Sequence, residues 1–248
     1  MSWCEGVAVR FDRVSKSIGA TRILEDVSFE VPRGTALTIL GRRGAGKTIA
    51  LKLSIGLLKP DRGRIFVNND DITALGHSAL LQVRKSIGFV FQQAAVFDSL
   101  SVAENIAFPL RCSKETEGEL HERVYQQLLQ VGLEQDIDRM PDDLSVGMRK
   151  LLGFARALSC DPAILLLDDP WNGVDSVTAD LIRDRLLSLK HRRGTTLLIA
   201  ANKMTDVQSM TDQLAVLDGG HMIACGPLNE VARSDHPVVR QFVLQQDF

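Results

Sequence analysis

Residues Gly41-Arg42-Arg43-Gly44-Ala45-Gly46-Lys47-Thr48 carry the pattern G-x-x-x-x-G-K-[ST]. An apolar run (36–40) precedes the pattern and a segment with helical spacing (49–58) follows it, the context that distinguishes a phosphate-binding loop from a chance match. Glycines let backbone amides turn towards an anion, and the helix adds unpaired N–H groups and the positive end of its dipole. We therefore expect a bound nucleotide, with Lys47 on its outer phosphates and the Thr48 hydroxyl on Mg²⁺. The residues expected to contact the nucleotide here are Gly41, Gly44, Ala45, Gly46, Lys47, Thr48 and Ile49.

Composition limits the class of protein. With 248 residues and 45% hydrophobic content, the chain can form one large domain or a domain with a subdomain. The net charge of −2 gives no bulk basic surface, so we expect no nucleic-acid partner. The apolar runs fall far short of the roughly 20 residues that span a bilayer, and the first residues do not resemble a secretory signal. We expect a cytoplasmic protein whose membrane role, if any, depends on a partner.

The pattern of apolar residues predicts an α/β fold. Residues 7–11 and 27–31 alternate apolar and polar side chains, and Pro32-Arg33-Gly34 forms a turn after them, which indicates antiparallel strands. After the loop, strand-like runs alternate with helical segments, as in a parallel sheet covered by helices. The strand-like runs are 64–67, 87–91, 163–167 and 195–201.

Between residues 93 and 161 the periodicity becomes mainly helical, so we expect a helical subdomain inserted between two strands. Ser101-Val102-Ala103-Glu104 has the form of a capping box, and residues 119–131 have helical spacing before Gly132. We predict one domain over 1–230 with this insertion. Helical character starts again near residue 228, and 231–248 form a predicted helical tail whose apolar side chains pack against the rest: Val238, Val239, Phe242 and Val243.

Two carboxylates end the apolar run Ile164-Leu165-Leu166-Leu167. An acid at the end of such a strand faces the phosphate loop and holds magnesium, and Asp168 is our candidate. Asp169 is the candidate general base for the attacking water. For either acid alone, capping the next turn is the structural alternative.

Ser145-Val146-Gly147 precedes a helical segment, which places a Ser-x-Gly turn at a helix N-terminus. A hydroxyl, backbone amides and a helix dipole make such a turn a second anion site. Serine is also an ordinary N-cap residue. The position of the turn shortly before Asp168 favours the interpretation as an anion site.

These motifs, in this order, resemble the ATP-binding cassette (ABC) ATPases over nearly the whole chain. The resemblance implies ATP and Mg²⁺ bound between two head-to-tail subunits, with Ser145 and Gly147 touching the γ-phosphate across the dimer. Gln92, in Val90-Phe91-Gln92-Gln93, matches the family's glutamine that contacts magnesium and senses a membrane permease. Asp175 matches the acid of the loop that crosses the dimer interface.

A narrower resemblance is to the ATPase subunits of bacterial phospholipid-transport (Mla-type) systems that work with MCE-domain proteins. It rests on the sequences at 91–110, 148–150 and 237–242. It implies phospholipid transport, an MCE-type lipid-binding partner, a homodimer at the inner face of the cytoplasmic membrane, and a groove at 92–110 for a short permease helix.

Four positions depart from the ABC pattern. The family's catalytic glutamate is here Asp169, one methylene shorter, and the family's switch histidine aligns with Asn202, which cannot become cationic. Val146 replaces a glycine, so the turn either keeps negative φ or is distorted. Ile18 stands where an aromatic residue often stacks on adenine.

These departures leave three functional alternatives. We favour a slow ATPase that powers lipid movement through a permease, with Asp169, Asn202 and Gln92 in catalysis. The second is a subunit that binds ATP but hardly hydrolyses it, acting as a regulatory scaffold or the weak half of a heterodimer. The third is a non-transport ABC ATPase without a permease.

Overall fold

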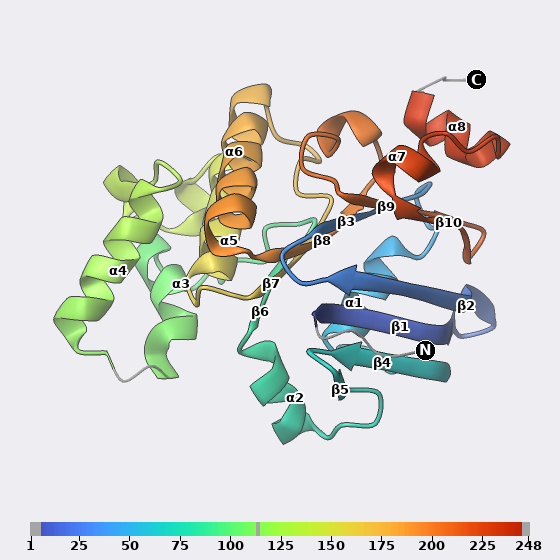
Figure 1. Ribbon diagram of the computed structural model, residues 1–248. Helices are drawn as coiled ribbons and strands as arrows, with labels where there is room; N and C mark the ends of the chain where they lie inside the picture. The colour runs from blue at the N-terminus through green and yellow to red at the C-terminus, as the bar shows by residue number, and fades with distance from the viewer. Residues whose placement is uncertain (1–5, 113–114, 245–248) are drawn as a thin grey trace.

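The computed structural model describes residues 6–112 and 115–244, and its elements form two sheets with helices around them (Figure 1). The α/β class predicted from the sequence is confirmed. The strands are β1 Val7–Ile18, β2 Thr21–Pro32, β3 Ala36–Leu40, β4 Arg62–Val67, β5 Asp70–Asp71, β6 Ile87–Val90, β7 Ile164–Asp168, β8 Thr196–Ala201, β9 Gln213–Asp218 and β10 His221–Pro227. The α-helices are α1 Lys47–Ser54, α2 His77–Arg84, α3 Val102–Ala107, α4 Glu117–Leu129, α5 Val146–Leu158, α6 Ser176–Arg193, α7 Leu228–Val231 and α8 Pro237–Leu244. The short 3-10 helices are η1 Phe108–Cys112, η2 Glu134–Asp136, η3 Pro141–Asp143 and η4 Met204–Asp206.

The larger sheet has the order β10-β9-β3-β8-β7-β6, and its strands from β9 to β6 run parallel. Alternate side chains of each strand face opposite layers because successive residues in a strand point to opposite faces. In β8, Leu197 and Ile199 pack in a cluster with the helices α3 to α6, whereas Leu198 and Ala200 pack with α1 and the second sheet. The sheet is therefore buried on both faces, as its continuous apolar strands require.

The smaller sheet has the order β2-β1-β4-β5 and is antiparallel. This corrects one prediction, because residues 64–67 belong to β4 in this sheet and not to the parallel sheet. The local alternation of side chains predicts a strand but carries no information about its pairing partner. A second correction concerns the helix predicted over 49–58. It ends at Ser54 and is followed by Gly56, which has φ of +64°.

The helices α3, α4 and α5 lie between β6 and β7 in the sequence and project to one side of the sheet (Figure 1). The capping box at Ser101 is present: its hydroxyl accepts from the backbone of Glu104, whose carboxylate accepts from the Ser101 N–H. The expected helix over 119–131 is α4.

The C-terminal segment forms two helices, α7 and α8, rather than one continuous helix. Val239 is fully buried, and Val238, Phe242 and Val243 pack partly buried against the same core as the helices α3 to α6. Residues 245–248 of the predicted tail lie outside the described part of the chain. Within that part, no helix has the length and apolar character needed to cross a membrane.

Candidate nucleotide-binding site

The loop from Gly41 to Lys47 joins β3 to α1 and packs closely against two other strands. A Cβ on Gly41 would lie 2.4 Å from the Leu217 carbonyl oxygen of β9. Gly46 has φ of +104°, and a Cβ there would lie 2.6 Å from a Leu24 methyl carbon of β2. Glycine is thus required at both positions, for space at Gly41 and for space and backbone conformation at Gly46.

Lys47 is buried, and its ammonium donates hydrogen bonds to three oxygens. The acceptors are the carbonyl oxygens of Gly41 (2.6 Å) and Arg42 (3.0 Å) and the side-chain oxygen of Asn202 (2.9 Å). Burial lowers the pKa of Lys47, while the carboxylates of Asp169 and Asp168 act in the opposite direction. These acceptors hold the ammonium at the loop, where oxygens of a phosphate can replace them.

Four neighbouring strands end at this edge of the sheet. The register pairs Leu40 of β3 with Ala201 of β8, Ala200 of β8 with Asp168 of β7, and Leu167 of β7 with Val90 of β6. Since the carboxyl ends of parallel strands meet at one edge, the segments that follow them are brought together. This edge therefore carries the phosphate loop, Asn202, the Asp168–Asp169 pair and, beyond β6, Gln92.

Asp168 is the last residue of β7, and its carboxylate accepts a hydrogen bond of 3.0 Å from the Thr48 hydroxyl. Burial raises the pKa of Asp168, and the Thr48 hydrogen bond opposes the rise. In the described ranges no group of three His, Cys, Asp or Glu side chains is placed to hold a metal. The oxygens of Thr48 and Asp168 instead fit Mg²⁺, which binds through one or two protein oxygens together with water and phosphate oxygens.

Asp169 follows β7 with φ of +45°, an uncommon value for a residue other than glycine. Its N–H donates to the Ala200 carbonyl oxygen at 2.9 Å. The Asn202 amide nitrogen donates to the Asp169 carboxylate, while the oxygen of the same amide accepts from Lys47. Burial raises the pKa of Asp169, and Lys47 opposes the rise. The three side chains thus form a chain of hydrogen bonds in the order Lys47, Asn202, Asp169.

Two further predicted residues make no side-chain hydrogen bond within the described ranges. Gln92 is exposed in the loop after β6, and no side-chain hydrogen bond involves it within the described ranges. Ile18 ends β1 with 52% of its surface exposed, opposite Thr21 of β2, the strand against which the phosphate loop packs.

Ser145 and Gly147 lie on a different part of the chain, at the N-terminus of α5. The Ser145 hydroxyl accepts from the Met148 N–H at 3.2 Å, as an N-cap. Val146 is the first residue of α5 and keeps negative φ. Of the two alternatives for this turn, negative φ or distortion, the first is therefore correct. A Cβ on Gly147 would lie 3.4 Å from a carboxylate oxygen of Asp175, the N-cap of α6. Sequence patterns alone did not reveal that the Ser145–Gly147 turn and Asp175 are neighbours.

The helix α8 also reaches this site. Arg42 of the phosphate loop donates a hydrogen bond of 2.9 Å to the Gln241 side chain. A cavity of about 800 Å³ adjoins the loop, lined by Arg42, Asp169, Asn202 and Phe242 among others. The sequence predicted that the tail would pack but gave no sign of where, because 199 positions separate Arg42 from Gln241.

Comparison with known proteins identifies the family of the chain. The family model described as ABC transporter matches residues 24–172. The probable ribonucleotide transport ATP-binding protein mkl of Mycobacterium leprae (strain TN) is 37% identical over 239 residues, covering 96% of this chain and 69% of the relative. The methionine import ATP-binding protein MetN of Bradyrhizobium diazoefficiens is 34% identical over 244 residues, covering 96% of this chain and 70% of the relative.

Solved structures have the same fold. The ATP-binding cassette MJ0796, a dimer in a post-hydrolysis state with ADP and Pi, superposes with a TM-score of 0.83 at 27% identity, covering 89% of this chain and 98% of that one. The cbiO1 subunit from Clostridium perfringens superposes with a TM-score of 0.82 at 29% identity, covering 97% and 96%. ABC ATPases bind ATP with Mg²⁺, dimerise and pair with transmembrane permeases. The chain therefore belongs to the ABC transporter family as an ATP-binding subunit, whose general activity is ATP hydrolysis coupled to transport.

Proposed function

We propose that the edge formed by β3, β8, β7 and β6 holds ATP and Mg²⁺, and that Asp169 acts as the base for hydrolysis. The observation that carries this proposal is that two sets of side-chain hydrogen bonds lie at this edge. One set joins Lys47, Asn202 and Asp169, and the other joins Thr48 and Asp168. In the proposed complex Ile18 covers the adenine; Gly41, Gly44, Ala45, Gly46 and Ile49 surround the triphosphate; Lys47 contacts its outer phosphates; and Thr48, Asp168 and Gln92 hold Mg²⁺.

Asn202 has two roles in this proposal. In the structure Asn202 connects Lys47 to Asp169, and in the proposed complex the γ-phosphate takes the place of the Asn202 oxygen as an acceptor from Lys47. Its amide nitrogen then remains available to Asp169 or to a phosphate oxygen. Because an amide does not titrate near neutral pH, Asn202 gives the transition state less charge stabilisation than a histidine cation.

A second copy of the chain completes the site. Ser145 and Gly147 sit at the N-terminus of the 13-residue helix α5, whose N–H groups suit an anion, yet no hydrogen bond within the described ranges connects them to the phosphate loop. We assign them, with Asp175, to the ATP held by the other subunit of a head-to-tail homodimer. We treat residues 1–230 as one ATPase domain, with 93–161 as its helical subdomain and 231–248 as a tail.

Hydrolysis is slow in this proposal. The Asp169 carboxylate is one methylene shorter than a glutamate, and a general base has to lie within about 2.6 to 3.2 Å of its proton donor or act through a water. The same feature supports the second candidate, a subunit that binds ATP but hardly hydrolyses it and acts as a regulatory or scaffold component.

We further propose that the partner permease moves phospholipid, with an MCE-type lipid-binding protein, and that the ATPase sits on the inner face of the cytoplasmic membrane. The support is the resemblance of the segments 91–110, 148–150 and 237–242 to such ATPases. The names of the relatives mention ribonucleotide and methionine transport instead. A complex purified with its own permease, reconstituted in vesicles, would transfer a fluorescent phospholipid and not labelled methionine or ribonucleotide; the reverse result would contradict the lipid assignment.

Release of phosphate by the purified protein tests the enzymatic role. We expect release that requires Mg²⁺ and is lost in Lys47→Ala, because this change removes the cation placed at the outer phosphates. Binding of a fluorescent ATP analogue is measured in parallel. Nucleotide binding without any Lys47-dependent release would favour the second candidate, and absence of both would contradict the assignment of the site.

A further inference from the structure

Lys150 of α5 contacts the turn that follows β7. Its ammonium donates a hydrogen bond to the carbonyl oxygen of Asn172, three residues after Asp169. Lys150 is half-buried, and within the described ranges it forms no ion pair with a carboxylate. Burial lowers the pKa of Lys150, and the nearby carboxylate of Asp169 opposes this change. The ammonium therefore lies within electrostatic reach of the proposed base, while its hydrogen bond is to the backbone.

Backbone hydrogen bonds connect Asp169 to two neighbouring elements. The N–H of Asp169 donates to the Ala200 carbonyl oxygen of β8 at 2.9 Å. The carbonyl oxygen of Asp169 accepts from the Asn172 N–H at 3.1 Å, and the Asn172 carbonyl oxygen in turn accepts from Lys150. The backbone of the proposed base is thus joined to β8 on one side and, through Asn172, to α5 on the other.

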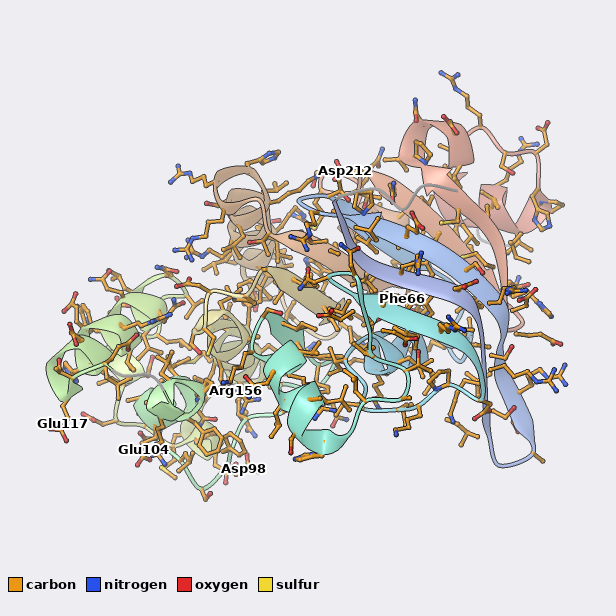
Figure 2. All side chains as sticks on the ribbon, turned by 60° about the horizontal axis from the view of Figure 1, so that its bottom comes forward. Phe66, Asp98, Glu104, Glu117, Arg156 and Asp212 are labelled. Carbon is orange, nitrogen blue, oxygen red and sulfur yellow. The ribbon has the colours of Figure 1, made fainter. Side chains whose placement is uncertain are left out.

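The helix α5 is a fixed support for Lys150. A Cβ on Gly153 would lie 2.4 Å from the Ala94 carbonyl oxygen, so the helix packs closely against the loop after β6. One turn further along, Arg156, labelled in Figure 2, donates to the Ala95 carbonyl oxygen at 2.5 Å. Because α5 is held in this way, a hydrogen bond from it restrains the turn after β7.

We propose that Lys150 is a positioning residue for ATP hydrolysis, which fixes the turn that carries Asp169 and so sets the distance between that carboxylate and the attacking water. A displacement of about 1 Å in a reacting group can cost about 100-fold in rate. The short side chain of Asp169 makes the position of its backbone more important. This inference rests on the proposed function, because it concerns the base assigned there, and it adds a residue of another element that acts through that base.

Single-turnover phosphate release by the full chain, in two backgrounds, tests the proposal. Lys150→Met keeps an apolar stem and removes both the donor and the charge. We expect about tenfold slower release, with unchanged affinity for a fluorescent ATP analogue. Lys150→Arg, which keeps the donor and the charge, should recover most of the rate. In the Asp169→Asn background Lys150→Met should have almost no further effect, because Lys150 acts through the base.

Lys190→Met is the matched control. Lys190 donates to the Met210 carbonyl oxygen at 2.9 Å and pairs with Asp212, which Figure 2 shows well separated from Arg156 of α5. This change also removes a hydrogen bond from a lysine to the backbone, so it should lower the melting temperature and leave the single-turnover rate unchanged. If Lys150→Met does not fold, Lys150→Gln replaces it and should show the same loss, because its side chain is shorter and uncharged.

A natural rate in the folded Lys150→Met or Lys150→Gln variant, no recovery in Lys150→Arg, or an equal loss in the two backgrounds would overturn the inference. The expected slow release by Asp169→Asn alone, together with any of those results, would reject the positioning role and leave the proposed function intact. Release by Asp169→Asn as fast as that of the natural protein would instead reject Asp169 as the base, and the role of Lys150 with it.

Discussion

The phosphate loop and the Asp169–Asn202 pair occupy the same edge of the sheet but are built in different ways. The loop depends on backbone shape, which Gly41 and Gly46 permit and which β2 and β9 hold in place. The pair depends on side-chain length, because Asp169 and Asn202 reach each other only through their terminal atoms. Binding of an anion by backbone amides therefore tolerates little change in the loop, whereas substitution in the pair can leave binding intact and alter the chemistry.

Gly46→Ala should give the largest effect on ATP affinity, a loss of at least about 100-fold, because a left-handed backbone and an overlap with Leu24 act together. Gly44→Ala is the matched control, since Gly44 also has positive φ but a Cβ there meets nothing within 4 Å. Titration with a fluorescent ATP analogue measures both affinities, and thermal melting checks the fold. Equal losses in the two variants would show that packing against β2 is unimportant.

Asp169→Asn should lower turnover by about 10² to 10⁴, the usual loss on removing a general base, with ATP affinity nearly unchanged. The amide keeps the size of the side chain but cannot accept a proton. Steady-state phosphate release and nucleotide titration separate the two quantities. Unchanged turnover would mean that Asp169 is not the base.

The same substitution should stabilise the nucleotide-free protein at neutral pH. Burial raises the pKa of Asp169, so the folded state binds the proton more tightly than the unfolded state does. Stability of the natural protein therefore falls as pH rises from the ordinary Asp value of about 3.9 through the raised pKa. Melting curves should show Asp169→Asn more stable at pH 7 than the natural protein, with the difference shrinking towards pH 4. A difference that grows at low pH would contradict this sign.

The sequence predicted the phosphate loop, the acid pair and most strands because each leaves a local signal. The run Ile164-Leu165-Leu166-Leu167 before two acids and the Ser101 capping box are patterns of this kind. Pairing and distant contacts leave no such signal. For that reason β4 was assigned to the wrong sheet, and neither the Arg42–Gln241 contact nor the proximity of Gly147 to Asp175 was foreseen.

The amide of Asn202 shows how the structure sharpens a prediction. The alignment of Asn202 with the family's switch histidine indicated only that this side chain cannot become cationic. The contacts show that one side chain joins Lys47 to Asp169, so a change at position 202 alters a hydrogen-bond partner of both residues.

Single-turnover phosphate release by the double variant Asp169→Glu, Asn202→His tests whether the phosphate loop binds ATP normally while the Asp169–Asn202 pair limits the rate of hydrolysis. We predict a rate several-fold above that of the natural protein, at an unchanged ATP dissociation constant. An unchanged rate at saturating ATP would show that the Asp169–Asn202 pair does not limit hydrolysis.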